Sequence, residues 1–153
     1  MNSLQRQQSH GKRRYHADPT AMFKVMNKLT PFNDIELLRL ELPIRLSFEA
    51  LRTGQGTESD FHDLAAAINT TMVRSEAVDQ LCEQTAIAAR DALMRCWHRH
   101  QRTGVWGFDG PALLEVEAGI DLHEQLIRLS TPLQMIEALR TVMQRGRCGE
   151  VVS

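Results

Sequence analysis

The feature that most constrains this chain is the recurrence of apolar side chains at every third or fourth position along most of its length. This spacing places them on one face of an α-helix, which turns once in about 3.6 residues. We find no clear alternation of apolar and polar residues of the kind that half-buried strands show. Aromatic residues, which strands favour, make up only 5% of the chain. The sequence therefore predicts an all-α fold.

Start and stop signals divide the chain into five or six helices. Acidic residues and threonines cap helix starts, and proline fits the first helical position. Thr57 with Asp60 resembles a capping box, and Gly104 provides a stop. The expected helices cover residues 19–28, 31–52, a segment opening at Thr57, a long segment from about 78 to 101, 111–129 behind Asp109, and 132–146. The segment at Thr57 and the long segment could join near Ser75.

The segment 31–52 carries two adjoining apolar stripes. One consists of Ile35, Leu38, Leu42 and Leu46, and the other of Leu37, Leu40, Ile44, Phe48 and Leu51. Together they make a wide apolar face, so we expect this helix to lie buried at the centre of the fold. Pro43 lacks a backbone donor and crowds the preceding turn, so it should kink or divide the helix.

The domain organisation follows from length and charge. A chain of 153 residues suits a single domain with a real core. Residues 18–146 form this helical domain, residues 1–17 are too polar to order alone, and residues 147–153 should fray. The first 16 residues hold four basic and no acidic side chains, whereas all 19 acidic residues follow. The sequence thus predicts a disordered basic N-terminal arm on an acidic body.

The arm is a candidate nucleic-acid contact. Its candidate residues are Arg6, Lys12, Arg13, Arg14 and Tyr15. Four cations can neutralise phosphates of DNA or RNA, and a tyrosine can stack on a base. The alternative is a terminus that only improves solubility, and the sequence leaves both open.

A run of metal-ligating residue types lies at Cys96-Trp97-His98-Arg99-His100. On a helix Cys96 and His100 share a face and His98 points away. Zinc needs about four ligands, so His62 or His123 would have to complete the site. The alternative is that Cys96 fills the core and the basic residues complement the dipole at a helix C-terminus. We expect no metal and no other cofactor, and keep a metal-dependent hydrolase or sensor as a third hypothesis.

No catalytic motif stands out in the sequence. It has no HExxH, GxxxxGK, GxGxxG or GxSxG pattern. His123 lies beside Glu124 on an apolar helix face, which is typical of a core histidine. The segment 64–74 faintly resembles a helix-turn-helix, but without a glycine at the turn we expect one continuous helix. These observations favour a protein that is not an enzyme.

The cellular setting is inferred from cysteines and hydropathy. Cys82 and Cys96 on one helix would lie about 21 Å apart and could not bridge, which favours a reducing compartment. No apolar run reaches the roughly 18 residues of a membrane span. We therefore expect a cytoplasmic protein without a membrane partner.

Several short patterns together resemble a known group of proteins. They are Arg13-Arg14, Asp18-Pro19, the Lys28-Leu29-Thr30-Pro31 step, Ala50-Leu51-Arg52-Thr53-Gly54, and Thr57 with Asp60. This order resembles uncharacterised small helical proteins of proteobacterial prophages and mobile elements, in which a late leucine-rich helix carries a histidine, here His123. The resemblance implies a helical fold and a genomic setting, and it transfers no catalytic residue.

The sequence leads to one main functional expectation and one alternative. We expect a non-enzymatic accessory or regulatory protein that binds other proteins through an apolar surface of its bundle, as a homo-oligomer. The alternative is a nucleic-acid-binding protein that uses the basic arm.

Overall fold

The fold of the chain is a bundle of α-helices. The computed structural model describes residues 18–20 and 29–147, and in these ranges it contains five helices and no strand. They are α2 (Asp34–Arg52), α3 (Glu58–Ser75), α4 (Gln80–Thr103), α5 (Gly110–Arg128) and α6 (Pro132–Arg147). This confirms the predicted all-α single-domain bundle. The basic arm, most of the helix expected at 19–28 and residues 148–153 lie outside the described residues.

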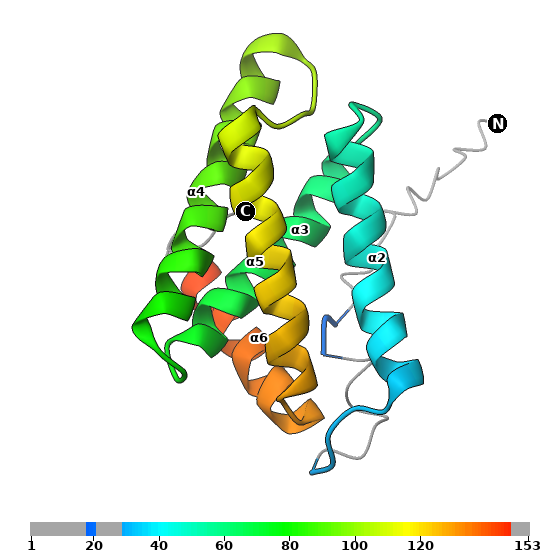
Figure 1. Ribbon diagram of the computed structural model, residues 1–153, viewed down its shortest axis with the longest axis vertical. Helices are drawn as coiled ribbons and strands as arrows, with labels where there is room; N and C mark the ends of the chain where they lie inside the picture. The colour runs from blue at the N-terminus through cyan, green and yellow to red at the C-terminus, as the bar shows by residue number, and fades with distance from the viewer. Residues whose placement is uncertain (1–17, 21–28, 148–153) are drawn as a thin grey trace, which may run out of the picture.

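Helix α3 lies at the centre of the bundle. Figure 1 shows α2, α4 and α5 standing upright, with α3 crossing behind them and α6 at the lower end. Helix α3 contacts the other four helices, whereas the main contacts of α2 are with α3 and α5. The prediction that the helix over 31–52 is central is therefore wrong, because α2 lies at the edge.

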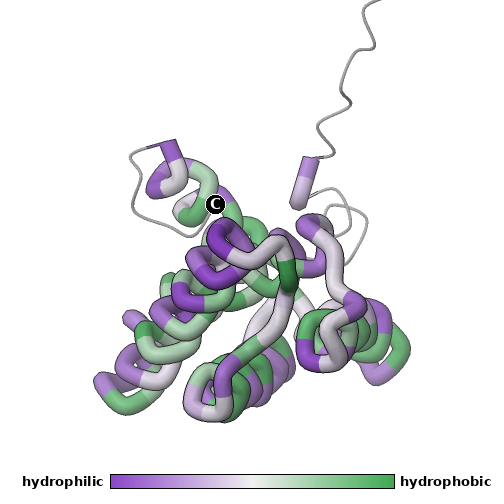
Figure 2. The backbone as a smooth tube through the Cα atoms, turned by 90° about the horizontal axis from the view of Figure 1, so that it is seen from above, coloured by the Kyte–Doolittle hydropathy of each residue, from purple (hydrophilic) through white to green (hydrophobic). Residues whose placement is uncertain are grey.

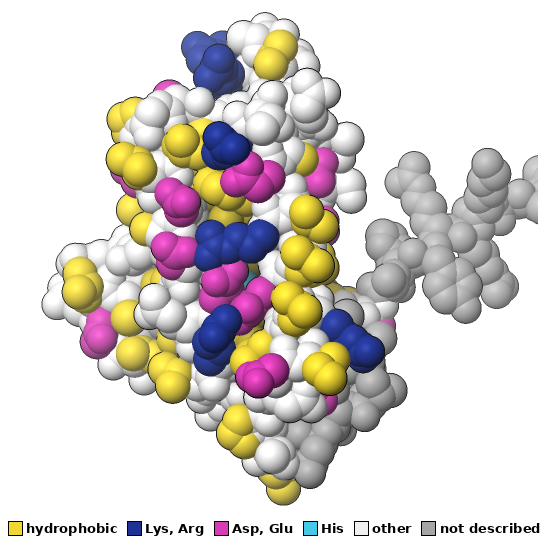
Figure 3. Space-filling model, turned by 45° about the vertical axis from the view of Figure 1, so that its right-hand side comes forward, with side chains coloured by type: hydrophobic (Ala, Val, Ile, Leu, Met, Phe, Trp, Pro, Cys, Tyr) yellow, Lys and Arg dark blue, Asp and Glu magenta, His cyan; other side chains and the backbone are white. Residues whose placement is uncertain are grey.

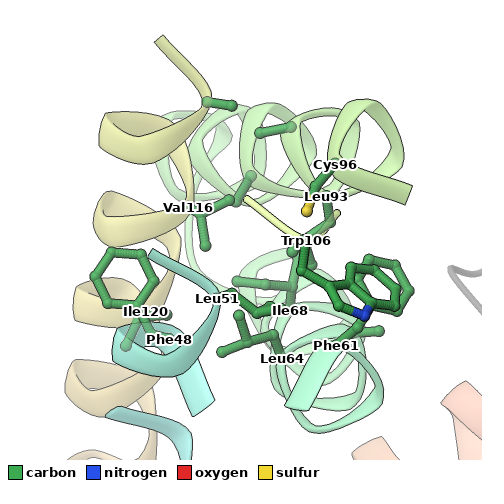
Figure 4. Close-up of a cluster of buried hydrophobic side chains, with 14 residues drawn as sticks. Phe48, Leu51, Phe61, Leu64, Ile68, Leu93, Cys96, Trp106, Val116 and Ile120 are labelled. Carbon is green, nitrogen blue, oxygen red and sulfur yellow. The ribbon is translucent and has the colours of Figure 1, made fainter. Parts of the chain in front are cut away.

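The main core surrounds α3 and draws on four helices. Phe61, Leu64 and Ile68 of α3 are fully enclosed, and Leu51 of α2 and Leu93 of α4 pack against them. Figure 4 shows these side chains converging, with Val116 and Ile120 of α5 on the neighbouring side. A second cluster joins Phe32 and Leu37 to Met135 and Ile136. These contacts hold the inner face of α2 to the body of the protein.

Three helix ends follow the sequence signals. The Thr57 hydroxyl accepts from the Asp60 amide, and the Asp60 carboxylate accepts from the Thr57 amide at 2.8 Å, which confirms the capping box. Gly104 ends α4 with a φ of 71°, in the left-handed region that glycine adopts without strain. Asp109 accepts from the Ala112 amide at 2.7 Å and caps α5.

One helix start needs correction, and the structure decides two alternatives that the sequence left open. Helix α2 begins at Asp34 and not at Pro31, because the Asn33 side chain accepts from two amides of the first turn and Glu36 bonds back to the Asn33 amide. Pro43 does not divide α2, which continues through it. Helices α3 and α4 do not join near Ser75, since a turn ends at Asp79, which caps α4. The segment 64–74 is one continuous helix, as expected.

Each helix is amphipathic. Figure 2 shows apolar and polar segments alternating along the tube of every helix, which is the pattern of helices that pack on one face and meet water on the other. Within the described part of the chain, no helix has both the length and the hydropathy of a membrane span.

Candidate protein-binding surface

One apolar stripe of α2 faces outward. Ile35 is 66% exposed, Leu38 59%, Leu42 48% and Leu46 61%. We call these four residues the α2 stripe. Figure 3 shows a line of hydrophobic side chains running down this side of the molecule. The sequence predicted that this stripe would be buried, and that prediction is wrong.

The stripe is exposed because the opposite face of α2 already fills the available core. Leu37, Phe48 and Leu51 are buried, and Leu40 and Ile44 are half-buried against the same clusters. A helix at the edge of a bundle can pack only one side on its neighbours, so its second stripe stays in water. The two stripes therefore have different roles, one in folding and one on the surface.

The charged residues along one border of the stripe are already paired within the molecule. The Arg45 guanidinium donates to Glu124 of α5 at 2.6 and 2.8 Å and to Asp121 at 2.5 Å. The hydrogen bonds to Glu124 raise the pKa of Arg45 above its ordinary value, although burial works against them. Arg128 likewise donates twice to Glu41, at 2.9 Å each. Figure 3 shows Lys or Arg side chains next to Asp or Glu side chains beside the line of hydrophobic side chains.

The size of the stripe is that of an interface centre. Full burial of a leucine or isoleucine contributes about 1.5–3 kcal/mol at ~25 cal/mol per Å², which corresponds to roughly 60–120 Å² per side chain. With the exposures above, the four side chains leave roughly 150–300 Å² of apolar surface in water. Single exposed apolar residues are common, whereas the largest contiguous apolar patch of a monomeric protein is often functional.

The stretch from Cys96 to Asp109 forms an aromatic cluster. The ring of His100 stacks on Trp106 with centroids 3.8 Å apart and planes 6° from parallel. Phe61 of α3 also stacks on Trp106, with ring centroids 5.2 Å apart. The ring centroid of Trp97 lies 5.2 Å from that of Phe61. Figure 4 shows Trp106 beside Phe61. This cluster ties the loop after α4 to the core.

The candidate metal ligands do not form a site with other ligand residues. Cys96 is buried in the main core, and burial raises the pKa of its thiol. His98 is exposed, and His62 lies near Glu58 at 3.4 Å. His123 is buried and bonds to Thr71. Among the described residues, no group of three or more His, Cys, Asp or Glu side chains could hold a metal ion.

A basic cavity lies at the C-terminal end of α4. It has a volume of about 570 Å³ and is lined by Arg95, His98, Arg99 and Arg102 among others. Arg95 pairs with Glu115 of α5. Arg99 and Arg102 are exposed, and neither forms an ion pair with the described residues. This face of α4 therefore carries a second cluster of basic residues, in addition to the four basic residues of the N-terminal arm.

Some predicted site residues cannot be placed, and some features were missed. Arg6, Lys12, Arg13, Arg14 and Tyr15 all lie outside the described residues. The exposure of the α2 stripe was not predicted, although the nine apolar positions of that helix are more than one face can bury. The stacking of His100 on Trp106 was not predicted either, because this contact joins a helix to a loop and helical spacing gives no signal for it.

Comparison with family models, with curated proteins and with solved structures finds no match to this chain. We therefore infer the function of this protein from the surfaces and cavities of the molecule.

Proposed function

We propose that this protein is a non-enzymatic accessory or regulatory protein that acts through protein–protein contacts made by the α2 stripe. The observation that carries this proposal is the exposure of Ile35, Leu38, Leu42 and Leu46 on one helix face. Covering such side chains contributes favourable free energy, whereas leaving them in water favours aggregation. The partner that fits the stripe best is a second copy of this chain.

The spacing of the stripe supports a second copy in antiparallel orientation. The outer pair, Ile35 and Leu46, and the inner pair, Leu38 and Leu42, have nearly the same midpoint in the sequence. When two such helices pack antiparallel across a two-fold axis, Leu38 opposes Leu42 of the partner subunit. Ile35 then opposes Leu46 of the partner subunit. Each leucine finds an aliphatic neighbour.

Charge along the border of the stripe also favours the antiparallel pair. Asp34 and Arg45 lie about three helical turns apart on the same border of the stripe. Antiparallel packing about a two-fold axis keeps the same border of the two helices together, so Asp34 of one copy lies near Arg45 of the partner subunit and joins Asp121 and Glu124, which Arg45 already contacts within its own chain. The helix dipoles also oppose each other only in the antiparallel pair.

The area of the stripe sets the expected strength of the dimer. A standard interface buries about 800 Å² per partner, so the stripe supplies its apolar centre and neighbouring residues must supply the rim. Four partly exposed aliphatic side chains without an aromatic anchor are modest binding determinants. We therefore expect a reversible dimer with a dissociation constant in the micromolar range.

Sedimentation equilibrium on the full chain tests this function. We expect a monomer–dimer equilibrium for the wild type, and at least about tenfold weaker association for Leu38→Glu. The matched control is Leu114→Glu on α5, because Leu114 is 67% exposed and lies outside the stripe. The control should associate like the wild type. A wild type that stays monomeric at the highest soluble concentration, or equal effects of both variants, would overturn the proposal.

We propose the genomic origin and the cellular location of the protein on separate observations. The resemblance of the chain to small helical proteins of prophages and mobile elements supports an accessory role in such an element. Cys82 and Cys96 are both free thiols on α4, which fits the reducing cytoplasm. Expression of the chain in a bacterial host and fractionation of the cells would test this localisation.

Binding of DNA or RNA is a second candidate function, and the basic face of α4 favours it. Arg99 and Arg102 are available for phosphates, and the arm with Arg13 and Arg14 supplies further cations. Fluorescence anisotropy with labelled DNA and RNA compares the full chain, a chain lacking residues 1–16 and the Arg99→Glu/Arg102→Glu double variant. Both changes should weaken a salt-sensitive binding. Binding that neither change weakens would exclude both surfaces.

A further inference from the structure

A second cavity lies between α2, α3, α5 and α6. It has a volume of about 340 Å³, within the range of small-molecule sites. Its walls are mostly aliphatic and include Leu40, Ile44, Ile127, Met135 and Leu139. Two buried polar side chains also line the cavity: Thr70, whose hydroxyl donates to the Ala66 carbonyl at 2.7 Å, and His123, which is only 7% exposed.

The hydrogen bonds of His123 fix its tautomer. Its Nδ1 lies 2.9 Å from the hydroxyl oxygen of Thr71. The Thr71 hydroxyl has one proton and donates it to the Ala67 carbonyl at 2.8 Å. Since the hydroxyl can then only accept, Nδ1 must carry the ring proton. The other nitrogen, Nε2, therefore presents a lone pair.

His123 lines the cavity, and Nε2 is the ring nitrogen that Thr71 does not contact. The described residues donate no hydrogen bond to Nε2. The fully enclosed polar side-chain atoms without a partner are Arg74 Nε and His100 Nδ1, and Nε2 is not among them. Among the described residues Nε2 therefore keeps some accessible surface, and the cavity is the open space that His123 lines. In apolar surroundings a hydrogen bond from a donor stabilises such an acceptor strongly, and an acceptor left without a donor costs free energy.

The acceptor persists at physiological pH. Burial lowers the pKa of His123 to about 4, and the neighbouring Glu124 opposes this only in part. The ring is thus neutral near pH 7. At the cavity wall Arg39 and Asp63 are both exposed, so charge is confined to the solvent side.

We propose that this cavity is a binding site for a small, mostly apolar molecule with a single N–H or O–H donor, which hydrogen-bonds to Nε2 of His123. The aliphatic walls bind the body of the molecule, and the histidine selects for the donor. This site is separate from the α2 stripe, which lies on the opposite face of α2, and it does not depend on the proposed dimer.

Two probes of the same shape test the selection. Indole carries one N–H donor, and benzothiophene has a sulfur atom in its place. Titration calorimetry on the full chain should show that indole binds about tenfold more tightly than benzothiophene, which is the worth of one net hydrogen bond. Absence of indole binding at millimolar concentration, or equal affinity for both probes, would overturn the proposal.

Variants and a spectroscopic readout assign the effect to the histidine. His123→Phe keeps a planar ring without the acceptor, so the preference for indole should disappear. Survival of the preference in this variant would refute the role of His123. If the variant does not fold, nitrogen NMR of the wild-type imidazole gives the answer, because indole should shift the Nε2 resonance of His123 more than that of Nδ1. An unchanged Nε2 resonance at saturating indole would also overturn the proposal.

Discussion

Gly119 of α5 lies directly against Ala89 of α4. A Cβ atom on Gly119 would come within 2.4 Å of the Ala89 Cβ and within 2.8 Å of Ile68 Cδ1 of α3. Both distances are far below van der Waals contact. Three helices therefore meet at a point where only a hydrogen atom fits, and this close approach positions α5, which carries the acidic partners of Arg45 and the buried His123.

The variant Gly119→Ala should destabilise the protein. We expect the free energy of unfolding to fall by about 1–3 kcal/mol, because overpacking outweighs the gain in helix propensity. Urea denaturation measures the effect. Gly110→Ala is the matched control, since a Cβ there meets nothing within 4 Å. Equal stabilities of the two variants would contradict the close packing of α4 on α5.

The variant His100→Phe should leave the stability unchanged or raise it. Phenylalanine keeps the stacking on Trp106 and removes Nδ1, which is buried without a hydrogen-bond partner and costs about 1–3 kcal/mol. His100→Ala should lower the stability, because it removes the stack. Thermal unfolding distinguishes these outcomes. A loss in His100→Phe as large as in His100→Ala would show that the nitrogen is needed, as a metal ligand would be.

The stability of the protein should depend on pH through His123. Its pKa is about 4 in the folded protein and about 6.5 in the unfolded chain. Below pH 6.5 the unfolded state binds a proton that the folded state excludes. The contribution of His123 to the free energy of unfolding is therefore fully present above pH 6.5 and is lost as the pH falls toward 4. The difference is worth on the order of 3 kcal/mol.

Urea denaturation between about pH 7.5 and pH 5 measures this dependence, because most carboxylates stay ionised there. The His123→Phe variant should show a flatter profile than the wild type over this range. Parallel profiles for the two proteins would show that His123 titrates near its ordinary pKa and that burial does not disfavour the charged form of the ring.

Most of the fold could be predicted from local sequence signals. The Thr57 box, the cap at Asp109 and the stop at Gly104 depend on neighbours within four residues, and the structure confirms all three. The start at Pro31 was wrong because a competing cap, Asn33, lies two residues later. Local rules identified the other caps but did not identify Asn33, because Pro31 already supplied a start signal just before it.

The exposure of the α2 stripe could not be predicted, because it depends on which neighbours each helix has. Leu37 and Leu38 are adjacent in the sequence, yet the first is buried and the second is exposed. Periodicity showed both as apolar positions of one helix, and only the packing of α2 at the edge of the bundle separates them. The same holds for His123, whose role as an acceptor depends on Thr71, a residue far away in the sequence.

The central claim is that the α2 stripe contacts a second copy in antiparallel orientation, and disulfide trapping tests it most directly. Cysteines at positions 38 and 42 are introduced on separate chains whose native cysteines have been replaced, and the chains are mixed and oxidised. A Leu38→Cys chain should bond to a Leu42→Cys chain, because opposed positions lie within about 7 Å and identical positions lie farther apart. A Leu114→Cys chain is the control. Disulfide formation between positions 38 and 42 no faster than in this control, or disulfide formation only between identical positions, would contradict the account.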